Sequence, residues 1–297
     1  MRSAIRIGCS GWHYASWRGR FYDPALRPDD WLDAYARVFD TVELNNSFYR
    51  LPPPEQFASW RARVPRGFLF AVKASRYITH LKRLRDPDEP LARLLEHAGA
   101  LGPALGPILF QLPPRWVPDR ARLEAFLDRL PRRLGNRRLW HALELREPAA
   151  YTPSLIERLR AHDVALCVHD MAGSDAPRLA TSGLVYVRLH GFGARYAGSY
   201  PDEVLADWAS WIRVQQADGR RVHVYFNNDV DANAIRDARR LAAMLGVAAT
   251  GAAVDTQGTP RARRSQRPRR TGSSEGARQT ASISRGRHTA ASGRRTR

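Results

Sequence analysis

Short segments in the first 230 residues alternate between aliphatic and polar positions, and this alternation predicts β-strands. In segment 41–53, Val42 and Leu44 alternate with Glu43 and Asn45, so aliphatic side chains share one face and polar side chains the other. The same pattern recurs in seven further segments: 5–11, 68–75, 107–112, 140–146, 164–170, 184–191 and 221–228. A solvent-facing edge strand would explain one such segment. The repetition instead indicates a barrel whose interior turns polar at one end.

Helical patterns separate these strands. The predicted helices are 28–39, a proline-started helix through Trp60, 88–101, 119–134, a helix starting at Thr152, a weak short segment between 170 and 184, 202–216 and 231–245. Eight strands alternating with helices predict an α/β fold, a single (β/α)8 TIM-type barrel over residues 1–246. A doubly wound open sheet is the alternative, but its central strands would be hydrophobic on both faces.

Charge is unevenly distributed along the 297 residues, which carry a net charge of +19. Residues 247–297 hold twelve arginines and only two acidic residues, show no periodicity and are predicted to form a disordered, basic C-terminal tail. No apolar run approaches the ~20 residues needed to span a bilayer, so no membrane association is expected. The N-terminus shows no apolar signal segment, and Cys9 and Cys167 fall within predicted strands. These features predict a cytoplasmic protein.

Eleven polar residues gather on the non-aliphatic faces near the ends of the predicted strands. They are Ser10, Glu43, Asn45, Lys73, Gln111, Glu144, Arg146, His169, Arg188, His190 and Asn227. Active sites of (β/α)8 barrels lie at the carboxyl ends of the strands, so this end of the barrel is the expected ligand site. The alternative is a network of interior ion pairs that holds the barrel together.

Several motifs resemble the YecE-like family, a group of uncharacterised proteins. They are Gly8-Cys9-Ser10-Gly11-Trp12 with Trp17 and Phe21-Tyr22, Val42-Glu43-Leu44-Asn45 with Phe48-Tyr49, Lys73 with Thr79-His80, Gln111-Leu112-Pro113-Pro114, Glu144-Leu145-Arg146, Tyr186-Val187-Arg188-Leu189-His190-Gly191 and Phe226-Asn227-Asn228. The resemblance implies a (β/α)8-like barrel and supplies no established activity. After Glu-x-Arg the family usually continues His-Pro-Ser-Trp, whereas this chain has Glu147-Pro148-Ala149-Ala150-Tyr151.

The first functional hypothesis is an enzyme or ligand-binding barrel for an anionic small molecule, such as a phosphoester or sugar phosphate. The predicted catalytic residues are Glu43, Glu144, Lys73 and His190. The predicted substrate-binding residues are Ser10, Trp12, Asn45, His80, Gln111, Arg146, Arg188 and Asn227. The carboxylates are candidate general acids and bases, while the cationic residues would neutralise substrate charge. No cofactor or metal is expected.

Other chemistry stays open at this point. Lys73 is a candidate Schiff-base nucleophile, although an ion pair with Glu43 on the neighbouring strand is the simpler interpretation. The pair Glu43 and Glu144 would suit glycoside hydrolysis if correctly separated. A divalent metal held by these glutamates together with His169, Asp170 or His190 is disfavoured by the adjacent arginines and lysine.

A nucleic-acid-binding module is the hypothesis from a different class. The arginine-rich tail would contact phosphates weakly and non-specifically. The aromatic residues of the loop after the first strand would stack on bases, unless they pack as a lid: Trp12, Tyr14, Trp17, Phe21 and Tyr22.

Overall fold

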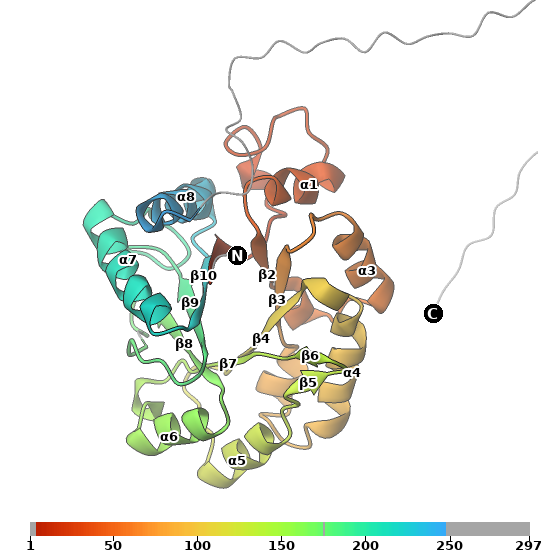
Figure 1. Cartoon of the computed structure of the whole chain (residues 1–297), viewed down its shortest axis with the longest axis vertical. Coiled ribbons are helices and arrows are strands. Elements are labelled where there is room, and N and C mark those ends of the chain that lie inside the picture. The colour runs from red at the N-terminus through yellow and green to blue at the C-terminus, as the bar shows by residue number, and fades with distance from the viewer. Residues whose placement is uncertain (1–3, 175, 248–297) are drawn as a thin grey trace, which may run out of the picture. The chain divides into compact units, whose positions relative to one another are not determined.

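Eight parallel strands form the centre of the protein in the computed structural model, which describes residues 4–174 and 176–247. Their hydrogen-bonded order is β1-β10-β9-β8-β7-β4-β3-β2. The strands are β1 (Ile5–Cys9), β2 (Thr41–Leu44), β3 (Leu69–Lys73), β4 (Leu105–Gln111), β7 (His141–Glu144), β8 (Ala165–Asp170), β9 (Leu184–Leu189) and β10 (Arg221–Phe226). They curve into a nearly closed barrel with helices outside it (Figure 1). The predicted barrel is confirmed, and the open doubly wound sheet is excluded. The predicted tail after residue 247 lies outside the described residues.

The helices run along the outside of the sheet. They are α1 (Trp31–Ala36), α2 (Asn46–Tyr49), α3 (Pro54–Ala62), α4 (Asp88–Gly99), α5 (Arg120–Asp128), α6 (Pro153–Ala161), α7 (Asp202–Ala217) and α8 (Asn233–Leu245). Thr152 caps α6 as expected, since its side chain accepts a hydrogen bond from the Leu155 backbone N–H. None of the helices within the described residues is long and apolar enough to cross a membrane.

Two helix predictions were wrong. The helix expected over 119–134 ends at Asp128, because Pro131 cannot continue it and the chain then forms a hairpin of β5 (Arg133–Leu134) and β6 (Arg137–Arg138). Gly135 makes the turn of this hairpin with a φ of 56°. The weak helix expected between β8 and β9 is also missing from the described part of 171–183, which forms turns and extended loop.

Apolar residues pack on both sides of the sheet, but unequally. The large cluster lies between the strands and the helices and includes Val42, Leu44, Phe70 and Val72. A small second cluster fills the barrel interior with Ala71, Leu109, Ala142, Ala165, Cys167, Leu184, Tyr186 and Tyr225. The faces predicted from the alternation are therefore confirmed. Toward the carboxyl ends of the strands, polar residues replace this small interior cluster.

The seam between β1 and β2 is bridged by a side chain. The hydroxyl of Tyr35 on α1 accepts a hydrogen bond from the Cys9 backbone N–H at 2.8 Å and donates one to the Thr41 carbonyl at 3.0 Å. Gly8 allows this close approach, since a Cβ at that position would lie 2.2 Å from the Thr41 carbonyl oxygen. Tyr35 thus completes the barrel where the two end strands meet.

Candidate functional site

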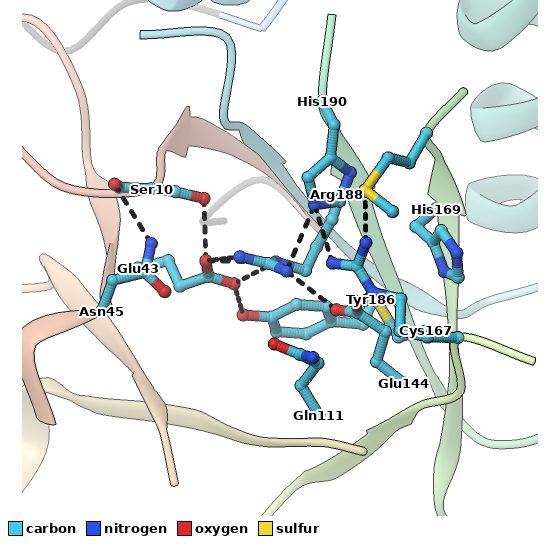
Figure 2. Close-up of polar contacts among 12 residues, drawn as sticks. Ser10, Glu43, Asn45, Gln111, Glu144, Cys167, His169, Tyr186, Arg188 and His190 are labelled. Atoms are coloured by element: carbon cyan, nitrogen blue, oxygen red, sulfur yellow. Dashed lines mark hydrogen bonds and ion pairs between the residues drawn. The ribbon is translucent and has the colours of Figure 1, made fainter. Parts of the chain in front are cut away.

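Glu43 and Arg188 form the centre of a buried polar cluster inside the barrel (Figure 2). Arg188 binds both oxygens of the Glu43 carboxylate, with its Nη2 2.8 Å from Oε1 and its Nε 3.0 Å from Oε2. Ser10 Oγ donates to Oε1 at 2.7 Å, and Tyr186 OH donates to Oε2 at 2.6 Å. The carboxylate of β2 is therefore satisfied by donors from the end of β1 and from β9.

Arg188 also joins Glu43 to a second carboxylate. Its Nη1 lies 2.8 Å from Glu144 Oε2, and Glu144 pairs in turn with Arg146. Both glutamates are fully buried, and Arg188 is 1% exposed. Two carboxylates and two guanidinium groups thus neutralise each other, as buried charges require. Because Arg188 lies between them, the glutamates face a guanidinium group rather than a site for a cation.

His190 is held by the same two arginines. Arg146 Nη2 lies 3.2 Å and Arg188 Nη1 3.3 Å from His190 Nε2. Guanidinium groups only donate hydrogen bonds, so Nε2 must accept, and the ring proton is on Nδ1, which donates to the Asp170 carbonyl at 3.2 Å. Burial and these two arginines hold the pKa of His190 well below its usual value. His190 is therefore neutral at physiological pH.

Ionisation inside the barrel follows from these contacts. Burial by itself would raise the pKa of Glu144, but Arg146 and Arg188 outweigh it and hold that pKa well below the usual value. Burial lowers the pKa of His169, whose Nε2 lies 3.3 Å from Ser174 Oγ. The cluster thus combines an ionised Glu144 with neutral imidazoles, and Glu144 is poorly suited to donate a proton.

Lys73 lies apart from this cluster at the carboxyl end of β3. Its Nζ is 4.2 Å from the centre of the Phe48 ring, and His80 packs edge-on against the same ring, with centroids 5.0 Å apart. His80 belongs to a π-helical segment, Tyr77–Leu81, a conformation often found at functional sites. Burial, then the neighbouring Arg188, lowers the pKa of Lys73 to about 8. Burial and Lys73 lower the pKa of His80 to about 4.

Two cavities at this end of the barrel are lined by predicted site residues. The larger is about 480 Å³ and is lined by Gln111, Pro114, Arg115, Arg146, Glu147, Pro148, Met171, Gly173, Ser174, Arg195 and Tyr196. The smaller is about 190 Å³ and is lined by Ser10, Gly11, Trp12, His13, Tyr14, Glu43, Leu44, Asn45 and Asn46. Among the described residues, three arginines line the larger cavity, against one acidic side chain, Glu147.

The predicted site residues occupy five places in the structure, and Ser10 and Arg146 each belong to two of them. Ser10, Glu43, Glu144, Arg146, Arg188 and His190 meet in the buried cluster, and Lys73 and His80 flank Phe48. Ser10, Trp12 and Asn45 line the smaller cavity, and Gln111 and Arg146 the larger. Asn227 is buried after β10, where its backbone N–H donates to the Leu189 carbonyl at 2.7 Å.

Sequence reasoning missed Tyr186, Arg115 and Arg195. Tyr186 could have been found, because it lies two residues before Arg188 on the same interior face of β9. Arg115 and Arg195 lie in loops, where no periodic pattern indicates which way a side chain points. Their place in the cavity depends on how the loops after β4 and β9 meet.

The loop aromatic residues after β1 pack mostly inside the protein. Trp17 is 0% exposed and Tyr22 2% exposed, and Tyr22 stacks on Trp31 of α1 with ring centroids 4.8 Å apart. Trp12 packs edge-on against Trp60. Trp17 and Tyr22 are therefore not available to stack on bases.

Metal-ligand geometry is found away from this site. In the described part of the chain, the one group of three candidate ligands is Glu124, Asp128 and His162, where α5 meets the end of α6. Arg158 already pairs with Glu124 at 2.7 Å. A cation there would have to compete with that guanidinium group.

Comparison with known proteins agrees with this fold and extends over nearly the whole chain. A family model described as "Protein of unknown function DUF72" matches residues 6–264. The chain belongs to the DUF72 family. The UPF0759 protein YunF of Bacillus subtilis is 25% identical over 280 residues, which is 84% of this chain and 97% of YunF. The UPF0759 protein YecE of Escherichia coli is 34% identical over 118 residues, 39% of this chain and 42% of YecE.

Solved structures of DUF72 proteins share the barrel. A DUF72 family protein from Thermotoga maritima has a TM-score of 0.71 and 26% identity, and the match covers 82% of this chain and 99% of that one. Another from Enterococcus faecalis has a TM-score of 0.67 and 21% identity, covering 82% and 96% respectively. The resemblance to the YecE-like family is confirmed. Segment 147–151 departs from the usual motif of that family, and its Glu147 lies in the wall of the larger cavity of this DUF72 barrel.

Proposed function

We propose that this DUF72 barrel binds a small anionic molecule, with a phosphate or carboxylate group held in the larger cavity. One observation carries the proposal: Arg115, Arg146 and Arg195 converge on a cavity of about 480 Å³ whose only acidic lining residue, among those that the structure describes, is Glu147. That volume lies in the range of small-molecule sites. Guanidinium groups bind phosphate and carboxylate through paired, charge-assisted hydrogen bonds.

The buried cluster holds one of the arginines of the larger cavity in place. Arg146 belongs to both, since it pairs with Glu144 inside the barrel and lines the cavity outside. Its orientation is fixed by buried partners, so little freedom is lost when a ligand binds. We assign Glu43, Glu144 and Arg188 to this supporting role, because each is buried and already paired.

Two exposed arginines allow the proposal to be tested without disturbing the cluster. Arg195→Ala and Arg115→Asn each remove one cationic group; asparagine suits position 115 because its φ is 56°. Arg160→Ala, on the far end of α6, removes an exposed arginine outside the cavity and is the matched control.

The measurement is a thermal-shift and calorimetric screen with inorganic phosphate, sugar phosphates and small carboxylates. The wild type and Arg160→Ala should bind the same anion, and each cavity variant should bind it about 10-fold more weakly, a typical loss for one charge-assisted contact. If no anion binds the wild type, or the cavity variants bind as well as Arg160→Ala, the proposed site is wrong.

A further inference from the structure

Lys73 is a buried amine without a carboxylate partner. It is 9% exposed at the carboxyl end of β3, and its Nζ rests over the Phe48 ring. Within residues 4–174 and 176–247, no ion pair is formed by its ammonium group. Buried lysines normally pair with an acid, so a buried lysine without one needs another explanation.

The geometry explains why Glu43 does not serve as that partner. In the register between β2 and β3, Glu43 lies opposite Ala71, so Lys73 is one interior position closer to the mouth of the barrel. The Glu43 carboxylate already accepts hydrogen bonds from Ser10, Tyr186 and Arg188. Glu144 is likewise bound by two arginines. Lys73 is therefore the surplus cation of the interior.

Its surroundings favour the neutral amine. Burial and Arg188 oppose protonation more strongly than the two glutamates promote it, and the pKa falls to about 8. About half of such lysines are neutral at pH 8, compared with under ~1% at the ordinary pKa of about 10.4. His80, which packs edge-on against Phe48, is neutral under the same conditions, with a pKa of about 4.

We propose that Lys73 is a carbonyl-reactive amine that forms an imine with an aldehyde or ketone bearing the anionic group. The Nζ lone pair adds to the carbonyl carbon and the carbonyl oxygen takes up the proton that Nζ loses, giving a neutral carbinolamine. Loss of water from this carbinolamine leaves the C=N bond, with no oxidant or reductant required. The anionic part of this inference rests on the proposed function, whereas the amine chemistry does not.

Lys73 and Lys82 are the only two lysines of the chain, so the lysine that reacts can be identified directly. Lys82 is the internal control: its side chain is 27% exposed and its Nζ lies 3.3 Å from Asp86 Oδ2. Full-length protein is incubated with glycolaldehyde phosphate or with glycolaldehyde, in the presence of sodium cyanoborohydride. Peptide mapping by mass spectrometry then measures the reduced adduct at each lysine and at the α-amino group.

Lys73 should be labelled at least 10-fold faster than Lys82 at pH 7.5, with a rate that rises with pH and levels off above about 8. Lys73→Arg keeps the positive charge and should abolish this labelling while remaining folded by circular dichroism. Lys82→Arg should leave labelling of Lys73 unchanged. Equal labelling of both lysines in the wild type, or no plateau with pH, would overturn the proposal.

The matched pair of aldehydes separates the two proposals. Glycolaldehyde phosphate should label Lys73 about 10-fold faster than glycolaldehyde if the anion site holds its phosphate. Fast labelling by both aldehydes at equal rates would support the imine and contradict the anion site. Slow labelling by both, in a protein that still binds phosphate in the thermal screen, would contradict the imine alone.

Discussion

Asp229 shows how one buried carboxyl group responds to the interior of the barrel. It follows β10, and its Oδ1 is buried with no hydrogen-bond partner among the described residues. Burial raises the pKa of Asp229 to about 7, and the neighbouring Tyr14 hydroxyl opposes that shift only partly. Glu144, although more deeply buried, keeps a low pKa because two arginines contact it. The difference between the two lies in their partners.

This difference predicts a pH-dependent stability. The folded state binds a proton at Asp229 more tightly than the unfolded chain does, so its stabilising contribution is complete below about pH 4 and is lost as pH rises through about 7. Asp229→Asn should therefore be more stable than the wild type at pH 8, by on the order of 3 kcal/mol, and equally stable at pH 4. Urea unfolding at several pH values measures this. Glu157→Gln, on the exposed face of α6, is the control, and a pH-independent difference for Asp229→Asn would contradict the assignment.

At the scale of elements, the described strands β1 and β2 are joined by side chains rather than by a ladder of backbone hydrogen bonds. Arg6 of β1 also pairs with Asp40, just before β2, at 2.7 Å. Together with Tyr35, this contact holds the first and last strands of the hydrogen-bonded order beside each other. The seam lies directly beside Ser10 and Glu43, so its geometry also sets the Ser10 hydrogen bond to the carboxylate.

Tyr35→Phe tests the role of this hydroxyl. The substitution keeps the ring in the core but leaves the Cys9 N–H and the Thr41 carbonyl without their bridging partner. The free energy of unfolding should fall by about 2–3 kcal/mol, the cost of unsatisfied buried polar groups. Tyr49→Phe, at a residue that is 72% exposed, should change it little. A loss below ~0.5 kcal/mol for Tyr35→Phe would show that the strands hold the seam without the hydroxyl.

At the scale of the whole molecule, the basic charge is concentrated after residue 247. These residues lie outside the described part of the chain, although the DUF72 match extends through residue 264. The segment is poor in the apolar residues that offset the entropy of ordering a chain. We expect it to be dispensable for folding of the barrel.

Two truncations test this expectation. A chain ending at Gly246 and one ending at Arg264 should both melt within a few degrees of the full-length protein. A large loss in the shorter chain alone would assign a folding role to residues 247–264, while a loss in both would assign it to the remainder of the segment. Differential scanning calorimetry provides the comparison.

Any nucleic-acid affinity of the full-length protein should reside mostly in residues 247–297. Twelve arginines after residue 247 would contact phosphates and release counterions, so binding should weaken steeply between about 50 and 200 mM salt. The chain ending at Gly246 should lose most of this affinity, since Trp17 and Tyr22 are packed inside the barrel domain. Equal, salt-tolerant binding by the truncated chain would support a nucleic-acid-binding barrel instead.

Periodicity along the sequence was sufficient to determine the barrel and the contents of its interior. Strands with alternating faces place every second residue inside a closed sheet, so Glu43, Glu144 and Arg188 had to share that interior. Helix ends were less certain, as the early stop of α5 before Pro131 shows. Local sequence fixes which face a side chain occupies because that choice depends only on backbone geometry.

Only the tertiary structure decided which interior charges pair. Glu43 was expected to pair with Lys73 on the neighbouring strand, yet it binds Arg188, 145 residues away along the chain. The register of β2 against β3 sets Lys73 one position nearer the mouth, and the curvature of the barrel brings β9 across to Glu43. Partners across a barrel depend on register and closure, which involve all eight strands at once, so no single segment of sequence contains them.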